Sequence, residues 1–186
     1  MSASRRSPAQ RRKRRLWRGI LAGLASIAAV VAAGLPLYVF PPVSSPEPAD
    51  VVFVIGPPDQ WRLDWAQQLL AEGTAGALMI STPDPDAESL CAADEPNPVE
   101  CARPDPFTTR GEARWLRSEM AARGWSRAIV ITVTPHVSRT RVVFDRCIPS
   151  SVQVVGRSTG LNLAKWAYQY LYQTAGFIKV ALNPGC

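Results

Sequence analysis

The residue best suited to proton transfer is His136, the single histidine of the chain, in the segment TVTPHVSRTR. The apolar run before it predicts a strand, so His136 falls on a strand-to-helix turn, where doubly wound proteins present polar groups to ligands. Arg139 and Arg141 follow within about one helical turn. A proton-exchanging group beside fixed positive charge suits a phosphate or carboxylate ligand. A solvated histidine among surface arginines is the alternative.

A second polar group, TTRGEA, opens a predicted helix. Thr109 as N-cap and Glu112 three positions later would form a capping box, in which each side chain bonds an exposed backbone N–H. Because capping boxes are common, this structural role is the simpler interpretation. The alternative is that Arg110 and the first N–H groups of the helix hold an anion together.

A third polar group, GPPDQWR, follows the first predicted strand and contains Asp59 and Arg62. Pro57 and Pro58 remove two of the backbone N–H groups on which a glycine-rich phosphate loop depends. The chain contains no G-x-G-x-x-G, Walker or G-x-S-x-G motif. We therefore expect neither a standard nucleotide site nor an α/β-hydrolase site, and we predict no cofactor.

Carboxylates are concentrated in the proline-rich stretch 81–106, which we expect to be a loop without regular structure. They lack the spacing of an EF-hand, so a solvated loop is favoured over a calcium site and no metal is predicted. The carboxylates are Asp84, Asp86, Glu88, Asp94 and Glu95.

Four cysteines lie beyond the apolar segment 19–40, and none forms a C-x-x-C motif. An even number of cysteines without metal-site spacing indicates disulfides in an oxidising compartment. Three pairings are possible. The most economical joins Cys91 to Cys101 within one loop and Cys147 to Cys186 at the C-terminal tail.

Positive charge is concentrated at the N-terminus. Of 21 Lys and Arg residues, eight lie in residues 1–18, which leaves 13 basic residues against 15 acidic ones in the remainder. A nucleic-acid-binding domain is therefore not expected, because its positive charge would have to lie on the folded part.

Residues 19–40 carry no charge and are long enough for a transmembrane helix, with Trp17 and Tyr38 near the two interfaces. The arginines before this segment predict a cytoplasmic N-terminus and an extracytoplasmic C-terminal domain at the plasma membrane. A cleaved secretory signal is the alternative, but its apolar region is usually shorter. With either a transmembrane helix or a cleaved signal, the C-terminal domain is expected to be exported.

The remaining chain predicts a proline-rich stalk at 41–50 and a domain at 51–186. Apolar runs predict strands at 51–55, 77–80, 128–133 and 152–155. Helical patterns lie between and after them, at 63–70, 109–124, 138–146 and 161–174. This alternation predicts an α/β fold with a doubly wound, mainly parallel sheet of Rossmann-like type.

The order of these segments resembles the ElyC/SanA/YdcF family of bacterial envelope proteins. The likeness covers about residues 49–156: a strand with ADVVFVIG, an arginine opening the next helix, a strand LMIST, the TRGEA helix start, and H-x-x-R after a strand that ends in threonine. Pro57, Pro58, Pro83, Val133 and Pro135 depart from the family pattern.

The resemblance implies a role in cell-envelope maintenance, through peptidoglycan precursor metabolism or exclusion of vancomycin-like compounds. The expected partners are the lipid bilayer, an anionic lipid-linked or nucleotide-like ligand, and envelope-synthesis proteins. A hydrolase of phosphate esters or glycans, with His136 as its proton-transfer residue, and a non-catalytic scaffold remain alternatives. The resemblance places six residues on the rim of one pocket: Arg62, Thr109, Arg110, Glu112, His136 and Arg139.

Overall fold

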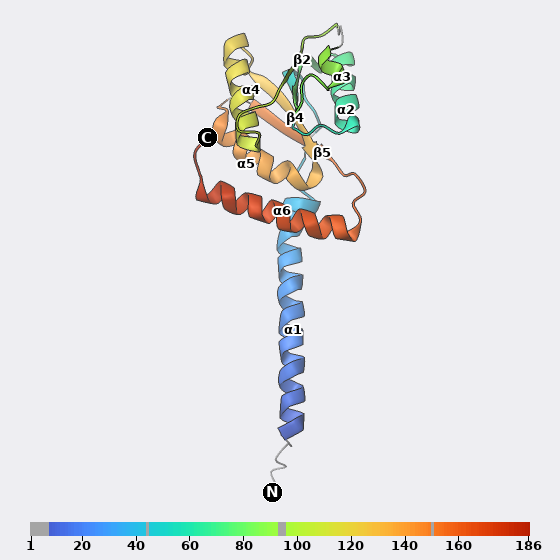
Figure 1. Ribbon diagram of the computed structural model, residues 1–186, viewed down its shortest axis with the longest axis vertical. Coiled ribbons are helices and arrows are strands. Elements are labelled where there is room, and N and C mark those ends of the chain that lie inside the picture. The colour runs from blue at the N-terminus through green and yellow to red at the C-terminus, as the bar shows by residue number, and fades with distance from the viewer. Residues whose placement is uncertain (1–7, 44, 93–95, 150) are drawn as a thin grey trace.

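The computed structural model describes residues 8–43, 45–92, 96–149 and 151–186. Figure 1 shows a long N-terminal helix that carries a domain of strands and helices at its C-terminal end. The elements follow in this order: α1 (Pro8–Gly34), the π-helical η1 (Leu35–Val39), β1 (Ala49–Val54), α2 (Gln60–Ala71), β2 (Ala75–Ser81), α3 (Ser89–Ala92), β3 (Val99–Ala102), α4 (Thr109–Arg123), β4 (Arg127–Val133), the 3₁₀ turn η2 (Thr134–His136), α5 (Val137–Cys147), β5 (Ser151–Arg157) and α6 (Leu163–Leu182).

The domain is built on a parallel sheet whose strand order is β3-β2-β1-β4-β5. The predicted α/β class, with helices on both faces, is confirmed. The chain leaves β1 toward β2 and β3, then returns to place β4 on the other side of β1. The carboxyl ends of β1 and β4 therefore flank the switch point at which doubly wound sheets bind ligands.

Alternate residues of the central strands face two separate cores, as the period of a strand requires. Val51 and Phe53 pack with Leu116 of α4 and Phe144 of α5 on one face. Val52 packs on the other face, against the apolar side of α2. Because both faces are covered, these strands read as continuous apolar runs in the sequence.

The expectation that 81–106 lacks regular structure is wrong. This stretch contains the short helix α3 and the edge strand β3, which pairs in parallel with β2 from Leu78 opposite Val99 to Ser81 opposite Ala102. A disulfide joins Cys91 of α3 to Cys101 of β3. The segment VECA is too short and too polar for its pattern to predict a strand. Its extended conformation is stabilised by pairing with β2.

The N-terminal apolar helix is long enough to span a membrane. The candidate span runs from Arg12 to Val39, through α1 and the π-helical turn η1, with a mean hydropathy of 2.2 in its most apolar window. The large apolar side chains of α1 are exposed. Tyr38, which was predicted to lie near a membrane interface, is buried against α6. Arg5 and Arg6 of the predicted basic tail lie outside the described residues.

The boundaries of several elements differ from the predicted ones, and two of these differences involve contacts between distant segments. Strand β1 begins at Ala49, within the predicted stalk, and Glu47 exchanges two hydrogen bonds with Gln153 of β5. Helix α6 continues beyond the predicted end at residue 174 to Leu182. Its middle contains Gly176, a weak helix former, but packing against Arg139 occupies the space that a side chain would need.

Candidate functional site

The N-terminus of α4 is capped by Thr108, whose Oγ1 accepts a hydrogen bond from the backbone N–H of Gly111 at 3.3 Å. The predicted capping box, with Thr109 as N-cap, is therefore wrong. Thr109 is the first helical residue, so its side chain is available for contacts with neighbouring elements. Thr108 and Thr109 are both suited to be the N-cap residue, and the local sequence pattern does not distinguish between them.

Glu112 reaches across to the exit of β1 instead of back to the cap. Its Oε1 accepts a hydrogen bond from the N–H of Gly56 at 2.8 Å, and the residue is 3% exposed. Burial raises the pKa of this carboxyl above its usual 4.5, although the Gly56 hydrogen bond and the charges of Arg62 and Arg139 act in the opposite direction. Glu112 thus ties α4 to the sheet.

His136 lies between two threonine hydroxyls. Its Nδ1 lies 3.1 Å from Oγ1 of Thr132 at the end of β4, and its Nε2 lies 3.4 Å from Oγ1 of Thr109. Removal from water, and secondarily the positive charges of Arg139 and Arg62, lower the pKa of the imidazole well below its usual 6.5. The ring is therefore neutral at neutral pH.

Arg139 connects α5 to α4 and α6. Its Nε donates to Oε1 of Gln173 at 2.9 Å, and its NH1 donates to Oγ1 of Thr109 at 3.3 Å. The guanidinium carbon also lies 5.6 Å from the ring centre of Tyr172. Because Thr109 accepts from Arg139, its own hydroxyl hydrogen is available to His136 Nε2, and the proton of the neutral ring is then placed on Nδ1.

Arg62 satisfies the loop that follows β1. The guanidinium donates to the carbonyl of Ile55 at 2.6 Å, to the carbonyl of Pro57, and to the carboxylate of Asp59 at 3.1 Å. It is 6% exposed, so most of its hydrogen-bonding capacity serves the protein itself. Arg62 thus positions the proline-rich loop, and its ligand-binding role stays a prediction.

Two cavities meet at Thr109. The first, the strand-end pocket, has a volume of about 440 Å³ and lies at the ends of β1 and β4. Its ionisable lining is mixed, because Asp59 and Glu112 accompany Arg62 and His136. The remaining lining residues are Ile55, Gly56, Pro57, Phe107, Thr108, Thr109, Thr132, Val133, Gln169, Tyr172 and Gln173.

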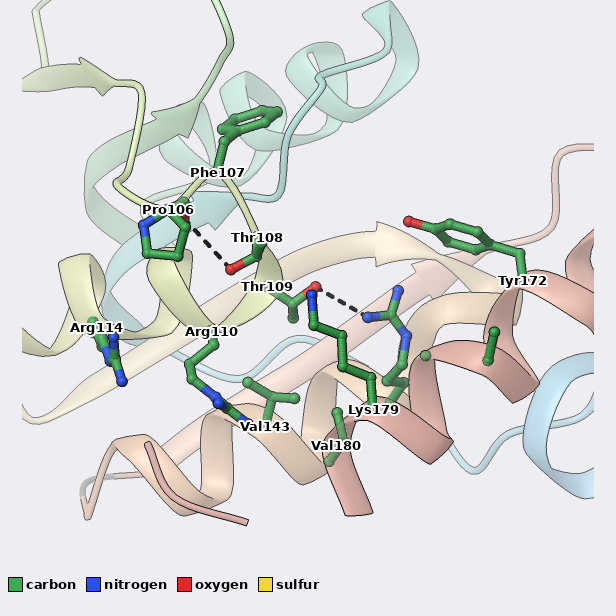
Figure 2. A pocket seen from close by; sticks show the side chains of 13 residues that line it. Pro106, Phe107, Thr108, Thr109, Arg110, Arg114, Val143, Tyr172, Lys179 and Val180 are labelled. Carbon is green, nitrogen blue, oxygen red and sulfur yellow. Dashed lines mark hydrogen bonds between the residues drawn. The ribbon is translucent and has the colours of Figure 1, made fainter. Parts of the chain in front are cut away.

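The second cavity, the helical pocket, has a volume of about 520 Å³ and lies between α4, α5 and α6. Four cationic side chains line it, and no carboxylate belongs to this lining. Figure 2 shows Lys179 reaching from α6 toward the start of α4, with Arg110 and Arg114 along α4. The lining residues are Pro106, Phe107, Thr108, Thr109, Arg110, Arg114, Arg139, Val143, Tyr172, Ala175, Gly176, Lys179 and Val180.

The structure brings the six predicted site residues together at two cavities instead of one. Arg62, Glu112 and His136 line the strand-end pocket, Arg110 and Arg139 line the helical pocket, and Thr109 lines both. Arg141 is directed elsewhere and donates to the carbonyl of Pro42 at 2.7 Å.

Several lining residues were not predicted from the sequence. Arg114 lies one helical turn after Arg110, and this spacing could have identified it. Tyr172, Gln173 and Lys179 belong to α6, and no local pattern shows that this helix closes the pocket.

The second disulfide joins Cys147 at the end of α5 to Cys186. Both disulfides thus follow the most economical of the three pairings open to the sequence. The chain between α6 and Cys186 passes along α4, where Arg110 donates to the carbonyl of Asn183 and Arg114 to that of Cys186. The disulfide therefore holds the last segment beside the helical pocket.

Among the residues that the structure describes, no three His, Cys, Asp or Glu side chains lie together in a way that could hold a metal ion. Two of the carboxylates weighed as calcium ligands, Asp94 and Glu95, lie outside the described residues.

These features define an α/β protein of the Rossmann-like class, with two ligand-sized cavities beside its sheet and an apolar N-terminal helix. Comparison of the chain with models of protein families, with curated proteins and with solved structures finds no match.

Proposed function

We propose that the protein binds an anionic, phosphate-bearing metabolite in the helical pocket. The observation that carries this proposal is the lining of that pocket by Arg110, Arg114, Arg139 and Lys179 without an opposing carboxylate. Guanidinium groups make paired, charge-assisted hydrogen bonds to phosphate oxygens. The first-turn N–H groups of α4, which have no partners within the helix, add a favourable dipole at the same place.

The proposed setting is the bacterial cell envelope. The TRGEA and H-x-x-R segments resemble the ElyC/SanA/YdcF family, which is associated with peptidoglycan precursor metabolism and the exclusion of vancomycin-like compounds. The arginines before α1 favour a cytoplasmic N-terminus, and the two disulfides suit an oxidising compartment. Both features support an extracytoplasmic domain anchored in the plasma membrane.

A membrane-borne ligand is favoured over a freely diffusing one. Helix α6 contributes Tyr172, Gly176 and Lys179 to the helical pocket and also contacts Tyr38 at the end of the apolar span. The pocket wall is therefore built on the helix next to the anchor. A polyprenyl phosphate presents its phosphate at this level of a bilayer.

The test measures binding of inorganic phosphate and of a short polyprenyl phosphate to the full chain in nanodiscs. Replacing Arg110 and Lys179 with Gln should weaken binding at least about tenfold, because each charged hydrogen bond contributes on the order of 1.5 to 3 kcal/mol. Replacing Arg127 and Arg157 with Gln removes the same charge outside the pocket and should change affinity less than about threefold. An equal loss of affinity in both variants would show that only the net charge of the protein matters, and would contradict the proposal.

Hydrolysis of a phosphate ester is the second candidate, because the Thr109 hydroxyl lies 3.4 Å from Nε2 of His136. Oγ1 of Thr109 would attack phosphorus as His136 takes its proton and the P–O bond to the ester alcohol breaks, and water would then hydrolyse the phosphothreonine to release phosphate. The lowered pKa of His136 makes it a weak base, so binding is favoured over catalysis. Phosphate release from p-nitrophenyl phosphate that Thr109→Val abolishes would favour the hydrolase.

A scaffold for envelope-synthesis partners is the third candidate. It predicts that neither phosphate nor the polyprenyl phosphate binds, and that the Arg110 and Lys179 variants retain the cellular phenotype of the wild type.

A further inference from the structure

Helix α6 has one face that packs on the domain and one that packs on nothing within the described residues. Gln173 and Val180 are buried against α5 and its neighbours. The opposite face carries large apolar side chains at helical spacing, which is unusual for the surface of a water-soluble domain. These are Leu163, Leu171, Ile178 and Leu182, with exposed fractions of 86%, 75%, 56% and 75%.

The charges and aromatic residues of α6 match a membrane interface. The helix contains no acidic residue, and its two charged side chains are Lys165 and Lys179. On a helical projection Lys165 lies on a flank beside the apolar face, where its amino group can reach lipid phosphates, whereas Lys179 reaches into the helical pocket. Tyr168 and Tyr172 stack on one another along that flank, with ring centres 5.7 Å apart. Amphipathic tyrosines are enriched at this depth of a bilayer.

Direct contacts fix α6 to the last turns of the apolar span. The ring of Tyr38 packs edge-on against Tyr170 with centres 5.0 Å apart, and its hydroxyl lies 3.0 Å from that of Thr174. The hydroxyl of Tyr170 donates to the carbonyl of Val31 at 3.0 Å. Gly34 makes this approach possible, because a Cβ there would overlap the Tyr170 ring. Figure 1 shows α6 lying across the end of α1.

The length of α1 sets the depth of α6. From Gly19, the first residue after the arginines, to Val31, the helix rises about 18 Å at 1.5 Å per residue, well short of the roughly 30 Å of a hydrocarbon layer. The apolar span continues to Val39. Any bilayer that α1 crosses therefore extends up to the side of α6 that faces away from the domain.

We propose that α6 is an interfacial helix that lies in the leaflet at which α1 ends. Its apolar face contacts acyl chains, while Lys165 lies at the phosphate level. The domain is then held against the membrane by two elements, one crossing the bilayer and one lying along it. This inference does not depend on the ligand of the helical pocket.

The test places photoleucine, a near-isosteric diazirine analogue of leucine, at Leu171 or Leu182 of the full chain in phosphatidylglycerol-containing nanodiscs. Photoleucine at Leu24 in α1 is the positive control. Photoleucine at Ala122, in the last turn of α4, is the negative control, and Figure 1 shows this end of α4 away from α6. Mass spectrometry after illumination identifies what each position has captured.

We expect lipid adducts at Leu171 and Leu182 within about twofold of the yield at Leu24, and about tenfold above the yield at Ala122. Cross-links from Leu171 to a second copy of the chain would overturn the proposal in favour of a dimer interface. Adducts with water alone would overturn it in favour of a solvated face. Melting temperatures equal to that of the wild type confirm that each labelled protein is folded.

A second variant tests the same inference by disturbing the contact between Gly34 of α1 and Tyr170 of α6. Gly34→Val should separate α1 from α6 and lower the lipid adduct at Leu171 at least about threefold. Gly23→Val is its control, because a Cβ at Gly23 meets no atom within 4 Å. An unchanged adduct yield in Gly34→Val would contradict positioning of α6 by α1.

Discussion

The two cavities on either side of Thr109 differ in charge balance although they share four lining residues. The strand-end pocket occupies the switch point of the sheet, the usual ligand site of the fold, but its cations are compensated by Asp59 and Glu112. The helical pocket lies away from the strand ends, and its four cationic side chains have no Asp or Glu beside them in the lining. The usual ligand position of the fold therefore favours the strand-end pocket as the ligand site, whereas the charge balance favours the helical pocket.

The difference follows from what each arginine bonds. Arg62 donates to two backbone carbonyls and to the carboxylate of Asp59, which offsets its positive charge. Arg139 donates to the neutral groups of Gln173 and Thr109, and no carboxylate among the described residues forms a hydrogen bond with it. A phosphate therefore gains more from Arg139 than from Arg62. Charge that is already paired is a poor predictor of ligand binding.

The largest expected effect comes from Arg139→Ala, because this side chain joins the two pockets. We expect phosphate affinity to fall at least about tenfold and the free energy of unfolding to fall by about 2 to 3 kcal/mol, since Gln173 and Thr109 lose a buried partner. Titration calorimetry and thermal unfolding of the full chain in detergent measure the two effects. Unchanged phosphate affinity would contradict the assignment of the anion to the helical pocket.

Gly176→Ala should displace Arg139 without removing it. A Cβ at Gly176 would lie 2.7 Å from Cδ and Nε of Arg139, so phosphate affinity should fall about threefold to tenfold. The higher helix propensity of alanine, about 1 kcal/mol, partly offsets the loss of stability. In an Arg139→Ala background the same change should stabilise the protein. A destabilising effect in both backgrounds would show that the cause lies elsewhere.

Glu112→Gln tests the strand-end pocket through pH. Because burial raises the pKa of Glu112 above 4.5, the unfolded state releases its proton first as pH rises, and the wild type loses stability from about pH 4.5 upward. The Gln variant keeps an acceptor for the Gly56 N–H and lacks this loss. Its stability relative to the wild type should increase with pH, as chemical denaturation at several pH values would show. Phosphate affinity should change less than about threefold.

His136→Asn should have the smallest effect at neutral pH. The folded-state pKa of His136 lies below 6.5, so the unfolded state takes up a proton first on acidification and the wild type loses stability as pH falls below about 6.5. The Asn variant should lose less between pH 6.5 and pH 5. The contribution of Glu112 has the opposite sign in this range, so the comparison is between variant and wild type at each pH. Parallel pH profiles would contradict a lowered pKa.

Most of the fold could be predicted because its signals are local. The runs around Val52 and Ile129 are apolar on both faces, which indicates buried parallel strands. Strand β3 escaped prediction because VECA has no such pattern and is ordered by pairing with β2 and by the disulfide at Cys101. Helix α6 was predicted too short because Gly176 weakens the helical signal, whereas packing on Arg139 requires the glycine.

The candidate site could be predicted in part. His136 and Thr109 were expected at the same edge of the sheet, and their side chains lie 3.4 Å apart. The role of Glu112 was mistaken because a capping box and a contact to Gly56 begin from the same sequence pattern. Whether Glu112 forms the capping box or contacts Gly56 depends on how closely the end of β1 approaches α4.

The sequence by itself determined the apolar helix near the N-terminus, the alternation of strands and helices, and the residues able to carry charge. These properties depend on side chains close together in the chain, where period and composition act directly. The tertiary structure alone decided which charges are paired and which line a cavity. Arg62 is satisfied by its own loop, whereas Lys179 comes from α6 to join Arg110. Such meetings depend on the packing of distant segments, which no local pattern encodes.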